Sequence, residues 1–576
     1  MRGILIAAML LIAITGLGYA EDAPRLQPGE KWVYGFAANL ANAKDVESKI
    51  ALIKRAKAAG YTGIVMADSK LAKFELMDDN YIHNVQKVRK VCADEGFKFI
   101  VPVGDIGYSN ELLTNDPNLA EGLPVRNAGF VVKEGKLVPD AAEGLELGAL
   151  EAGHGKWELG AFKADPDVKY QGKPTVLYEA GKGGGQGRIV QKIQVKPYHY
   201  YHVTVMAKTE GFTCKDNRIQ AYAAKAAGGG FVLDWQPILS DPKVGDTADW
   251  RQLHTTFSSL DNTEINLMIG TWGPKEGKLW LADVKVEPGG FVNVLRRDSC
   301  PLTLTSADGQ TTYQEGKDFA PVKDDKLLHD PNPGYSTIWH DAPVVSVPAG
   351  SQLKDGQKVL ASYNFMASCG KPNQVTVCLA EPKLYDIFEK QITWVKKNID
   401  PDGYHIGVDE IRVGGFDDAC VKSGKTPGQL LAAAVKKCTE LVHKIAPGKL
   451  VLTWNDMFDP YHNAPESSEK HNGYLTKAAE GKGAWAGSWE GVSPEVIVMD
   501  WMKKPESAKF WSDRGNQVIL AGYYDKAPEA IVDWMKAVKA EKNVVGIMYT
   551  TWNGVSGFKD LEAFIAAAKG YEAENK

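Results

Sequence analysis

Acidic and aromatic side chains recur where short apolar runs of this sequence end. The clearest case is the pair Asp409 and Glu410, which closes the apolar run that begins at residue 403. Two adjacent carboxyl groups suit acid–base chemistry, because one can carry a proton while the other stays ionised. The other side chains at such ends are Asp68, Asp105, Trp454, Asp456, Trp501, Tyr523, Tyr524, Asp525, Trp552 and Asn553.

Carboxyl groups mixed with aromatic rings are typical of enzymes that cleave glycosidic bonds. One carboxylic acid protonates the leaving oxygen, a second group stabilises the positive sugar centre, and aromatic rings hold the sugar. A metal-dependent hydrolase is less favoured, since these ends carry no pair of histidines with the spacing of metal ligands. The seven cysteines show no C-x-x-C spacing, so we expect no zinc cluster and no cofactor.

The elements that must position these residues are eight apolar runs that alternate with amphipathic segments. The runs are 33–37, 63–67, 98–102, 403–409, 449–454, 496–499, 518–521 and 544–549. Apolar residues at helical spacing mark segments at about 43–60, 80–95, 383–398, 427–446, 505–514, 527–540 and 558–569. Eight β/α units predict an α/β fold, a closed (β/α)8 barrel with its chemistry at the carboxyl ends of the strands. A doubly wound open sheet is the alternative.

The alternation stops after the third run, where the chain takes on another pattern. Short alternating runs separated by Gly, Asp, Asn and Pro predict an antiparallel β-sandwich that interrupts the barrel after strand three. The expected division is barrel strands one to three in 21–125, the sandwich in 146–288, a further β-rich region in 289–370, and barrel strands four to eight in 371–576.

The first residues have the pattern of a signal peptide. A cationic start, an apolar run from Ile4 to Ile14 and a small-residue end at Ala20 predict export to the periplasm or the medium, with cleavage after residue 20. An uncleaved signal anchor is the alternative. No stretch reaches the ~20 apolar residues of a membrane span. The net charge of −5 argues against nucleic acid, whose phosphates need a basic surface.

Cysteine positions give two further expectations. Cys92 and Cys438 fall on apolar faces of predicted helices, where buried and inert thiols are common. Cys369 and Cys378 are close enough in the sequence for a disulfide bond, although the spacing alone does not establish one.

Two segments resemble known protein families. The run 278–286 resembles the closing strand of jelly-roll carbohydrate-binding modules, and a purely structural sandwich is the alternative. The segment 405–410 is similar to the H-x-G-G-D-E signature of family 20 glycoside hydrolases, the β-N-acetylhexosaminidases, with Val408 in place of one glycine. The segments 452–456, 517–525 and 545–553 are similar to later strand ends of that family, in the same order.

The second resemblance implies a role for each matching residue. In that family the Glu is the general acid, and the preceding Asp orients the 2-acetamido group of the substrate, which attacks the anomeric carbon. The resemblance therefore implies that Glu410 is the acid/base and that Asp409 is the orienting carboxylate. It also implies that Tyr523 donates to the acetamido oxygen and that Trp454 and Trp552 enclose the sugar.

Two departures from that family concern the sugar pocket. The strand-one arginine of the family is missing from 35–39, and of the third-strand pattern P-E-I-D-x-P-G-H the chain keeps Asp105 but neither the Glu nor the His. Arg412 is a candidate for the lost cation, unless it pairs with Asp417 or Asp418. Asp105, which the chain keeps from the third-strand pattern, is expected to contact the ligand.

Three functions follow from these patterns. The first is a β-N-acetylhexosaminidase-like enzyme acting on an oligosaccharide or polysaccharide. The second is a glycosidase on a non-acetylated sugar, in which a conventional carboxylate such as Asp105, Asp456 or Asp525 assists Glu410. The third is a non-catalytic glycan-binding protein. His405 is either a substrate contact or a core histidine.

Overall fold

The computed structural model describes residues 24–150, 156–181, 187–213, 217–224, 230–237, 247–271, 276–327, 339–367, 374–467, 475–476 and 483–574. The expected signal peptide lies outside these residues, as does Cys369. None of the helices in this part of the chain combines the length and apolarity that crossing a bilayer requires.

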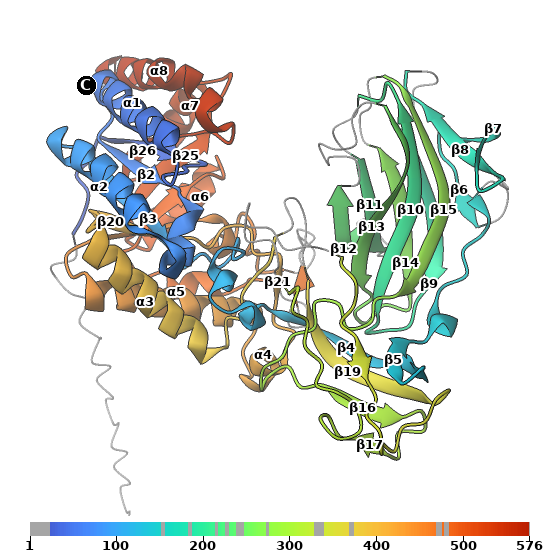
Figure 1. The fold of residues 1–576 in the computed structure, drawn as a ribbon. Coiled ribbons are helices and arrows are strands. Elements are labelled where there is room, and N and C mark those ends of the chain that lie inside the picture. The colour runs from blue at the N-terminus through green and yellow to red at the C-terminus, as the bar shows by residue number, and fades with distance from the viewer. Residues whose placement is uncertain are drawn as a thin grey trace, which may run out of the picture.

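Eight parallel strands close into a barrel in the order in which they occur along the chain (Figure 1). The closing pair joins the last strand to the first, with Trp32 beside Met548. The predicted α/β barrel is therefore confirmed, and the open sheet is wrong. The strands are β1 (Glu30–Gly35), β2 (Gly63–Met66), β3 (Lys98–Val103), β20 (Gly403–Ile406), β22 (Leu450–Trp454), β24 (Ile497–Asp500), β25 (Val518–Tyr523) and β26 (Val544–Thr550).

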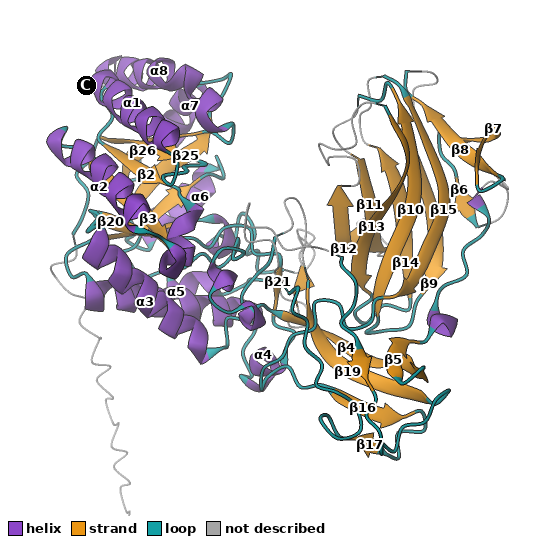
Figure 2. Ribbon diagram, viewed as in Figure 1, coloured by secondary structure: helices purple, strands orange, loops and turns teal. Residues whose placement is uncertain are grey.

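Helices cover the outside of the barrel, as the apolar periodicity predicts (Figure 2). The first begins after Asn42, whose side chain accepts two backbone N–H bonds, and ends at Gly60, where φ is 105°. A capping box of Thr426 and Gln429 begins the fourth long helix. The barrel helices are α1 (Ala43–Ala59), α2 (Asp79–Asp94), α3 (Pro382–Asn398), α5 (Pro427–Ile445), α6 (Pro505–Asp513), α7 (Ala530–Ala537) and α8 (Leu561–Glu574).

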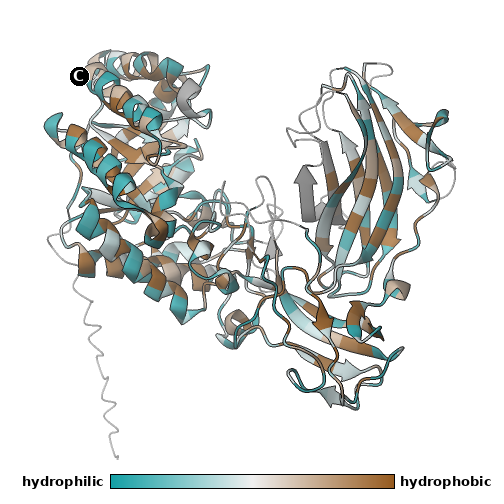
Figure 3. Ribbon diagram, in the orientation of Figure 1, coloured by the Kyte–Doolittle hydropathy of each residue, from teal (hydrophilic) through white to brown (hydrophobic). Residues whose placement is uncertain are grey.

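The barrel strands are apolar on both faces. Successive side chains of a strand point to opposite sides, so Trp32 belongs to the cluster that fills the interior and Val33 to the layer between strands and helices. Figure 3 shows the same division, with hydrophobic residues on the strands and hydrophilic ones on the outer helix surfaces. Cys92 and Cys438 are buried in the outer layer, as expected.

The chain between β3 and β20, which pair directly, forms separate antiparallel sheets. Two five-stranded sheets make up the sandwich. One contains β7 (Lys163–Tyr170), β8 (Lys173–Glu179), β10 (Tyr200–Glu210), β13 (Ala248–Ser258) and β15 (Lys278–Pro288). The other contains β6 (Trp157–Glu158), β9 (Arg188–Gln194), β11 (Asn217–Ala224), β12 (Gly230–Pro237) and β14 (Glu264–Thr271).

A six-stranded sheet takes strands from both sides of the sandwich in the sequence. Its members are β4 (Gly122–Lys133), β5 (Lys136–Pro139), β16 (Thr303–Ser306), β17 (Thr312–Tyr313), β18 (Val345–Ser346) and β19 (Lys358–Met366). The boundary expected at residue 125 thus falls inside β4. A short pair of β21 (Val413–Gly414) and β23 (Leu475–Thr476) lies elsewhere in the chain.

The sandwich and the six-stranded sheet share one apolar core. The rings of Tyr200 and Phe365 stack with centroids 3.9 Å apart. The rings of His202 and Trp339 stack at 3.5 Å. Each pair joins a sandwich strand to a residue beyond position 288, so the two sheet systems form a common folding unit.

This shared core gives a prediction about fragments. We expect residues 120–367 to melt cooperatively at a clearly higher temperature than residues 146–288, because the shorter piece exposes the rings that contact Trp339 and Phe365. Thermal unfolding followed by circular dichroism measures the melting temperatures of both fragments. Equal melting temperatures would show that the sandwich is stable without the six-stranded sheet.

Candidate active site

Three loops at the carboxyl end of the barrel form an acidic centre. They follow β3, β20 and β22, which are neighbours in the barrel. The first carries Asp105, the second Asp409 and Glu410, and the third Asp456. Because the carboxyl ends of parallel strands meet at the same rim, groups far apart in the sequence come together there.

Two glycines allow the first two loops to interlock. A Cβ atom on Gly107 would lie 1.8 Å from the carbonyl oxygen of Asp409, and one on Gly407 would lie 2.3 Å from Oδ1 of Asp105. The N–H of Ile106 donates to the carbonyl of Gly407 at 2.6 Å. Any side chain at either glycine would push the loops apart.

The backbone of Glu410 is held in a left-handed conformation, with φ of 50°. Such a conformation costs a residue with a Cβ about 1–2 kcal/mol, so surrounding contacts must hold it. The N–H of Glu410 donates to Oδ2 of Asp456 at 2.9 Å. Its carbonyl accepts from Nε2 of Gln374 at 2.8 Å. Hydrogen bonds therefore hold both the N–H and the carbonyl of Glu410.

The side chain of Glu410 has two partners of its own. The hydroxyl of Tyr108 donates to Oε2, and Nη2 of Arg412 lies 3.2 Å from Oε1. The side chain of Glu410 remains 31% exposed, so one face is open to a ligand. Asp417, one of the partners considered for Arg412, pairs with Arg297.

Asp409 and Asp105 both have raised pKa values. Burial raises the pKa of Asp409 to about 7, and the adjacent charge of Glu410 adds to this shift. Burial also raises the pKa of Asp105 to about 8, with further contributions from Glu111 and Asp409. Both groups therefore exchange protons near neutral pH, as acid–base chemistry requires.

Asp456 is the most enclosed carboxyl group of the centre. Its Oδ2 accepts from the Glu410 N–H and from Nδ2 of Asn463, at 2.9 and 3.1 Å. Among the described residues, its Oδ1 has no hydrogen-bond partner. Burial, and next the charge of Asp409, raise the pKa of Asp456 well above its ordinary range. Burial and the neighbouring Asp409 therefore both favour the neutral form of Asp456.

Aromatic rings line the barrel mouth beside these carboxyl groups. The ring centroid of Trp454 lies 5.1 Å from that of Tyr34 and 6.4 Å from that of Trp552. The ring of His405 lies 5.7 Å from Trp454, and neither of its nitrogens has a hydrogen-bond partner in the described chain. Burial lowers the pKa of His405 to about 3, so its ring is neutral. His405 therefore supports the tryptophan as a core histidine.

A second polar group lies in the loops after β25 and β26. Asp525 accepts hydrogen bonds from Tyr549, Thr551 and Asn553 at 2.6, 2.7 and 2.7 Å. Burial acts to raise the pKa of Asp525, but these hydrogen bonds outweigh it and lower the pKa. Nδ2 of Asn553 also donates to the hydroxyl of Tyr523 at 3.0 Å. Asp525 is thus an ionised residue that orients its neighbours.

Exposed aromatic side chains concentrate at this same rim. Tyr461, Tyr523 and Trp552 are 45%, 42% and 46% exposed, and they follow or end β22, β25 and β26. Exposed rings that gather at one site of a protein can mark a ligand-binding surface. A sugar, with its apolar C–H faces, suits such rings.

The sequence reasoning missed three contacts of the centre. The first is Tyr34, which alternation along β1 places inside the barrel with Trp32, although its residue type alone does not mark it as a site residue. Burial, then the charges of Asp409 and Asp105, raise the pKa of Tyr34, so it stays a donor beside them. Tyr108 stands in the loop that was compared with the third-strand motif. No signal in the sequence indicates Gln374.

Comparisons with known proteins give weak likenesses. No family model matches the chain, and no curated protein matches its sequence. A rhamnosidase from Novosphingobium sp. PP1Y is 11% identical, with a TM-score of 0.35 over 91% of this chain and 55% of the rhamnosidase. A family 16 carbohydrate-binding module is 18% identical over 22% of this chain and 84% of the module, with a TM-score of 0.16.

A third solved structure is TmCBM61 in complex with β-1,4-galactotriose. It is 14% identical over 24% of this chain and 94% of that chain, with a TM-score of 0.18. All three scores are low, so the functional argument rests on the residues of the barrel itself.

The interlocked glycines give a stability prediction. Gly107→Ala should lower the free energy of unfolding by about 1–3 kcal/mol, because the added methyl group collides with the Asp409 backbone. Gly570→Ala in α8 is the matched control, since nothing lies within 4 Å of its added Cβ. Urea unfolding measures the stability of both variants. Equal unfolding midpoints for Gly107→Ala and Gly570→Ala would show that the loops after β3 and β20 separate without cost.

The raised and lowered pKa values give a pH prediction with opposite signs at two positions. From about pH 4 to about pH 8, folded Asp105 keeps a proton that the unfolded chain releases, so this group makes the wild type less stable as pH rises. Asp105→Asn removes this loss, and its melting temperature relative to wild type should rise from pH 5 to pH 8.

The matched variant is Asp525→Asn. The ionised form of Asp525 stabilises the fold above its unfolded pKa, and this contribution is lost as pH falls through the folded pKa. Asp525→Asn should therefore be less stable than wild type at neutral pH and approach it in acid. If the melting temperatures of wild type and Asp105→Asn differ by the same amount from pH 5 to pH 8, the raised pKa of Asp105 is contradicted.

Proposed function

We propose that this protein is an exported glycoside hydrolase that acts on an oligosaccharide or polysaccharide at the carboxyl end of its barrel. The observation that carries the proposal is the combination found there. Carboxyl groups that titrate near neutral pH lie in the loops of one barrel rim, and exposed aromatic rings lie at the same rim. Cleavage of a glycosidic bond needs both.

In this proposal Glu410 is the general acid/base. Its carboxylate has one open face, and its backbone is fixed on both sides, so its position relative to a bound sugar is preorganised. Arg412 and Tyr108 orient the carboxylate, and a leaving-group oxygen would approach its exposed face. Trp552, which is exposed, would lie along the sugar ring, and the buried ring of Trp454 would support it from inside the barrel.

The role of Asp409 distinguishes two forms of the mechanism. If the sugar carries a 2-acetamido group, ionised Asp409 orients that group for attack on the anomeric carbon, and Tyr523 donates to its oxygen. If the sugar is not acetylated, a conventional carboxylate pair acts instead.

Substitution of the proposed acid tests the function. Glu410→Gln should lower turnover of natural glycans by ~10²–10⁴-fold, because the amide cannot donate a proton to the leaving oxygen. Aryl glycosides with good leaving groups should be less affected. Released reducing ends are measured on a panel of glycans, and Glu440→Gln on the exposed face of α5 is the control.

The outcomes separate the candidate functions. Inhibition of the wild type by a thiazoline indicates the acetamido mechanism, and turnover without such inhibition indicates the carboxylate pair. A fall of less than tenfold in Glu410→Gln would remove Glu410 from the acid role. Binding of glycans by a wild type that cleaves none of them would identify a non-catalytic glycan-binding protein.

A further inference from the structure

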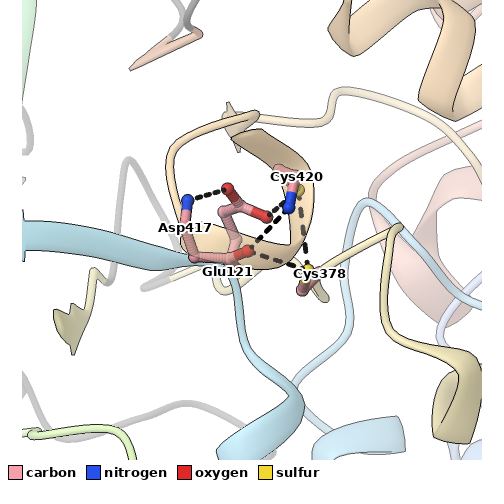
Figure 4. Close-up of side chains that lie close together, drawn as sticks. All are labelled: Glu121, Cys378, Asp417 and Cys420. Atoms are coloured by element: carbon pink, nitrogen blue, oxygen red, sulfur yellow. Dashed lines mark hydrogen bonds between the residues drawn. The ribbon is translucent and has the colours of Figure 1, made fainter. Parts of the chain in front are cut away.

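Two carboxyl groups and two thiols, all buried, meet at the junction of the barrel and the six-stranded sheet. Glu121 immediately precedes β4, Cys378 precedes α3, and Asp417 and Cys420 flank the start of α4 (Asp418–Lys422). One ligand atom of each lies within 4.8 Å of all the others. Figure 4 shows the four side chains pointing toward one another.

The distances between these atoms are those of a tetrahedral zinc site. The two Sγ atoms are 3.6 Å apart. Sγ of Cys378 lies 3.4 Å from Oδ1 of Asp417, and Sγ of Cys420 lies 3.4 Å from Oε2 of Glu121. A tetrahedral Zn²⁺ with ordinary bond lengths sets its ligands about 3.8 Å apart for two sulfurs and about 3.5 Å apart for sulfur and oxygen.

Outer contacts turn the remaining oxygens toward the thiols. Arg297 binds Oδ2 of Asp417, and the N–H of Phe416 donates to Oε1 of Glu121 at 2.6 Å. Oδ1 of Asp417 and Oε2 of Glu121 therefore face Cys378 and Cys420. Ligands of metal sites are commonly oriented by such outer hydrogen bonds.

The carboxyl groups of Glu121 and Asp417 are buried beside the two thiols, and Arg297 supplies one positive charge through Oδ2 of Asp417. Among acid groups this close, ionisation of each opposes ionisation of the next. A divalent cation removes this conflict, because it replaces the protons and binds all four ligand atoms.

We propose that Glu121, Cys378, Asp417 and Cys420 bind one Zn²⁺ as a structural site. Two thiolates and two carboxylates favour zinc over magnesium or calcium, which prefer oxygen alone. With four protein ligands the site is closed, so it serves stability. It joins the segment that leaves the barrel, the segment that returns to it, and the loop that also carries Glu410.

The spacing of the ligands explains why this site could not be recognised from the sequence. Asp417 and Cys420 are three residues apart, but the other two ligands come from 121 and 378. The chain has no C-x-x-C pair and no pair of histidines at its predicted strand ends, and these absences led to the expectation of no metal. Only the meeting of three chain segments assembles the ligand set.

Metal content of the full-length protein tests the proposal. After dialysis against Zn²⁺ and then against metal-free buffer, about one equivalent of zinc per chain should remain by elemental analysis. Co²⁺ in its place should give a thiolate-to-cobalt charge-transfer band in the near ultraviolet. Removal by a strong chelator should lower the melting temperature, and added Zn²⁺ should restore it.

Two variants and a control make the test specific. Cys378→Ser and Cys420→Ser should each lose most of the bound zinc and the charge-transfer band. Cys438→Ser, a buried thiol of α5, should keep both. If the ligand variants do not fold, cobalt titration and thiol titration of the wild type still show whether the thiols bind metal.

Two results would overturn the proposal. Wild-type protein that retains no zinc and gives no thiolate–cobalt band would show that the four groups hold protons only. A disulfide bond between Cys378 and Cys420, detected by peptide mass spectrometry in the purified protein, would show that the thiols serve as a crosslink. Neither readout depends on glycosidase activity, so the site and the proposed function are tested separately.

Discussion

The fixed backbone of Glu410 is the constraint on which the rest of the candidate site depends. Its left-handed conformation persists because Asp456 holds its N–H and Gln374 holds its carbonyl. The absence of a side chain at Gly107 lets the loop after β3 come against the same segment. Three loops from different parts of the chain thus define one carboxylate position, and the strain at Glu410 is offset by their contacts.

The pKa values of the centre follow from this crowding. Asp105, Asp409 and Asp456 are brought together with much of their surface covered by protein, so their ionised forms are unfavourable and their pKa values rise. Asp525, a short distance around the rim, has the opposite behaviour, because three donors surround it. One barrel rim therefore holds both proton-carrying and ionised carboxyl groups, which is the separation that acid–base catalysis uses.

Much of the barrel was predictable from the sequence alone. Runs such as 63–67 and 544–549 are apolar on both faces, and the segments between them carry helical periodicity, so local residue order specifies strand, helix and alternation. The sequence also placed Asp409, Glu410 and Trp454 at strand ends, because the end of an apolar run marks the end of a strand. The division into domains was less accessible, since β4 pairs with β19 far along the chain.

Only the tertiary structure decided which of these residues touch. The bond from Tyr108 to Glu410, the packing of His405 against Trp454, and the bond from Gln374 all join different segments. The cluster of Glu121, Cys378, Asp417 and Cys420 is of the same kind. Sequence periodicity records which side of an element a residue faces, but contacts between elements depend on how barrel closure and loop packing bring those sides together.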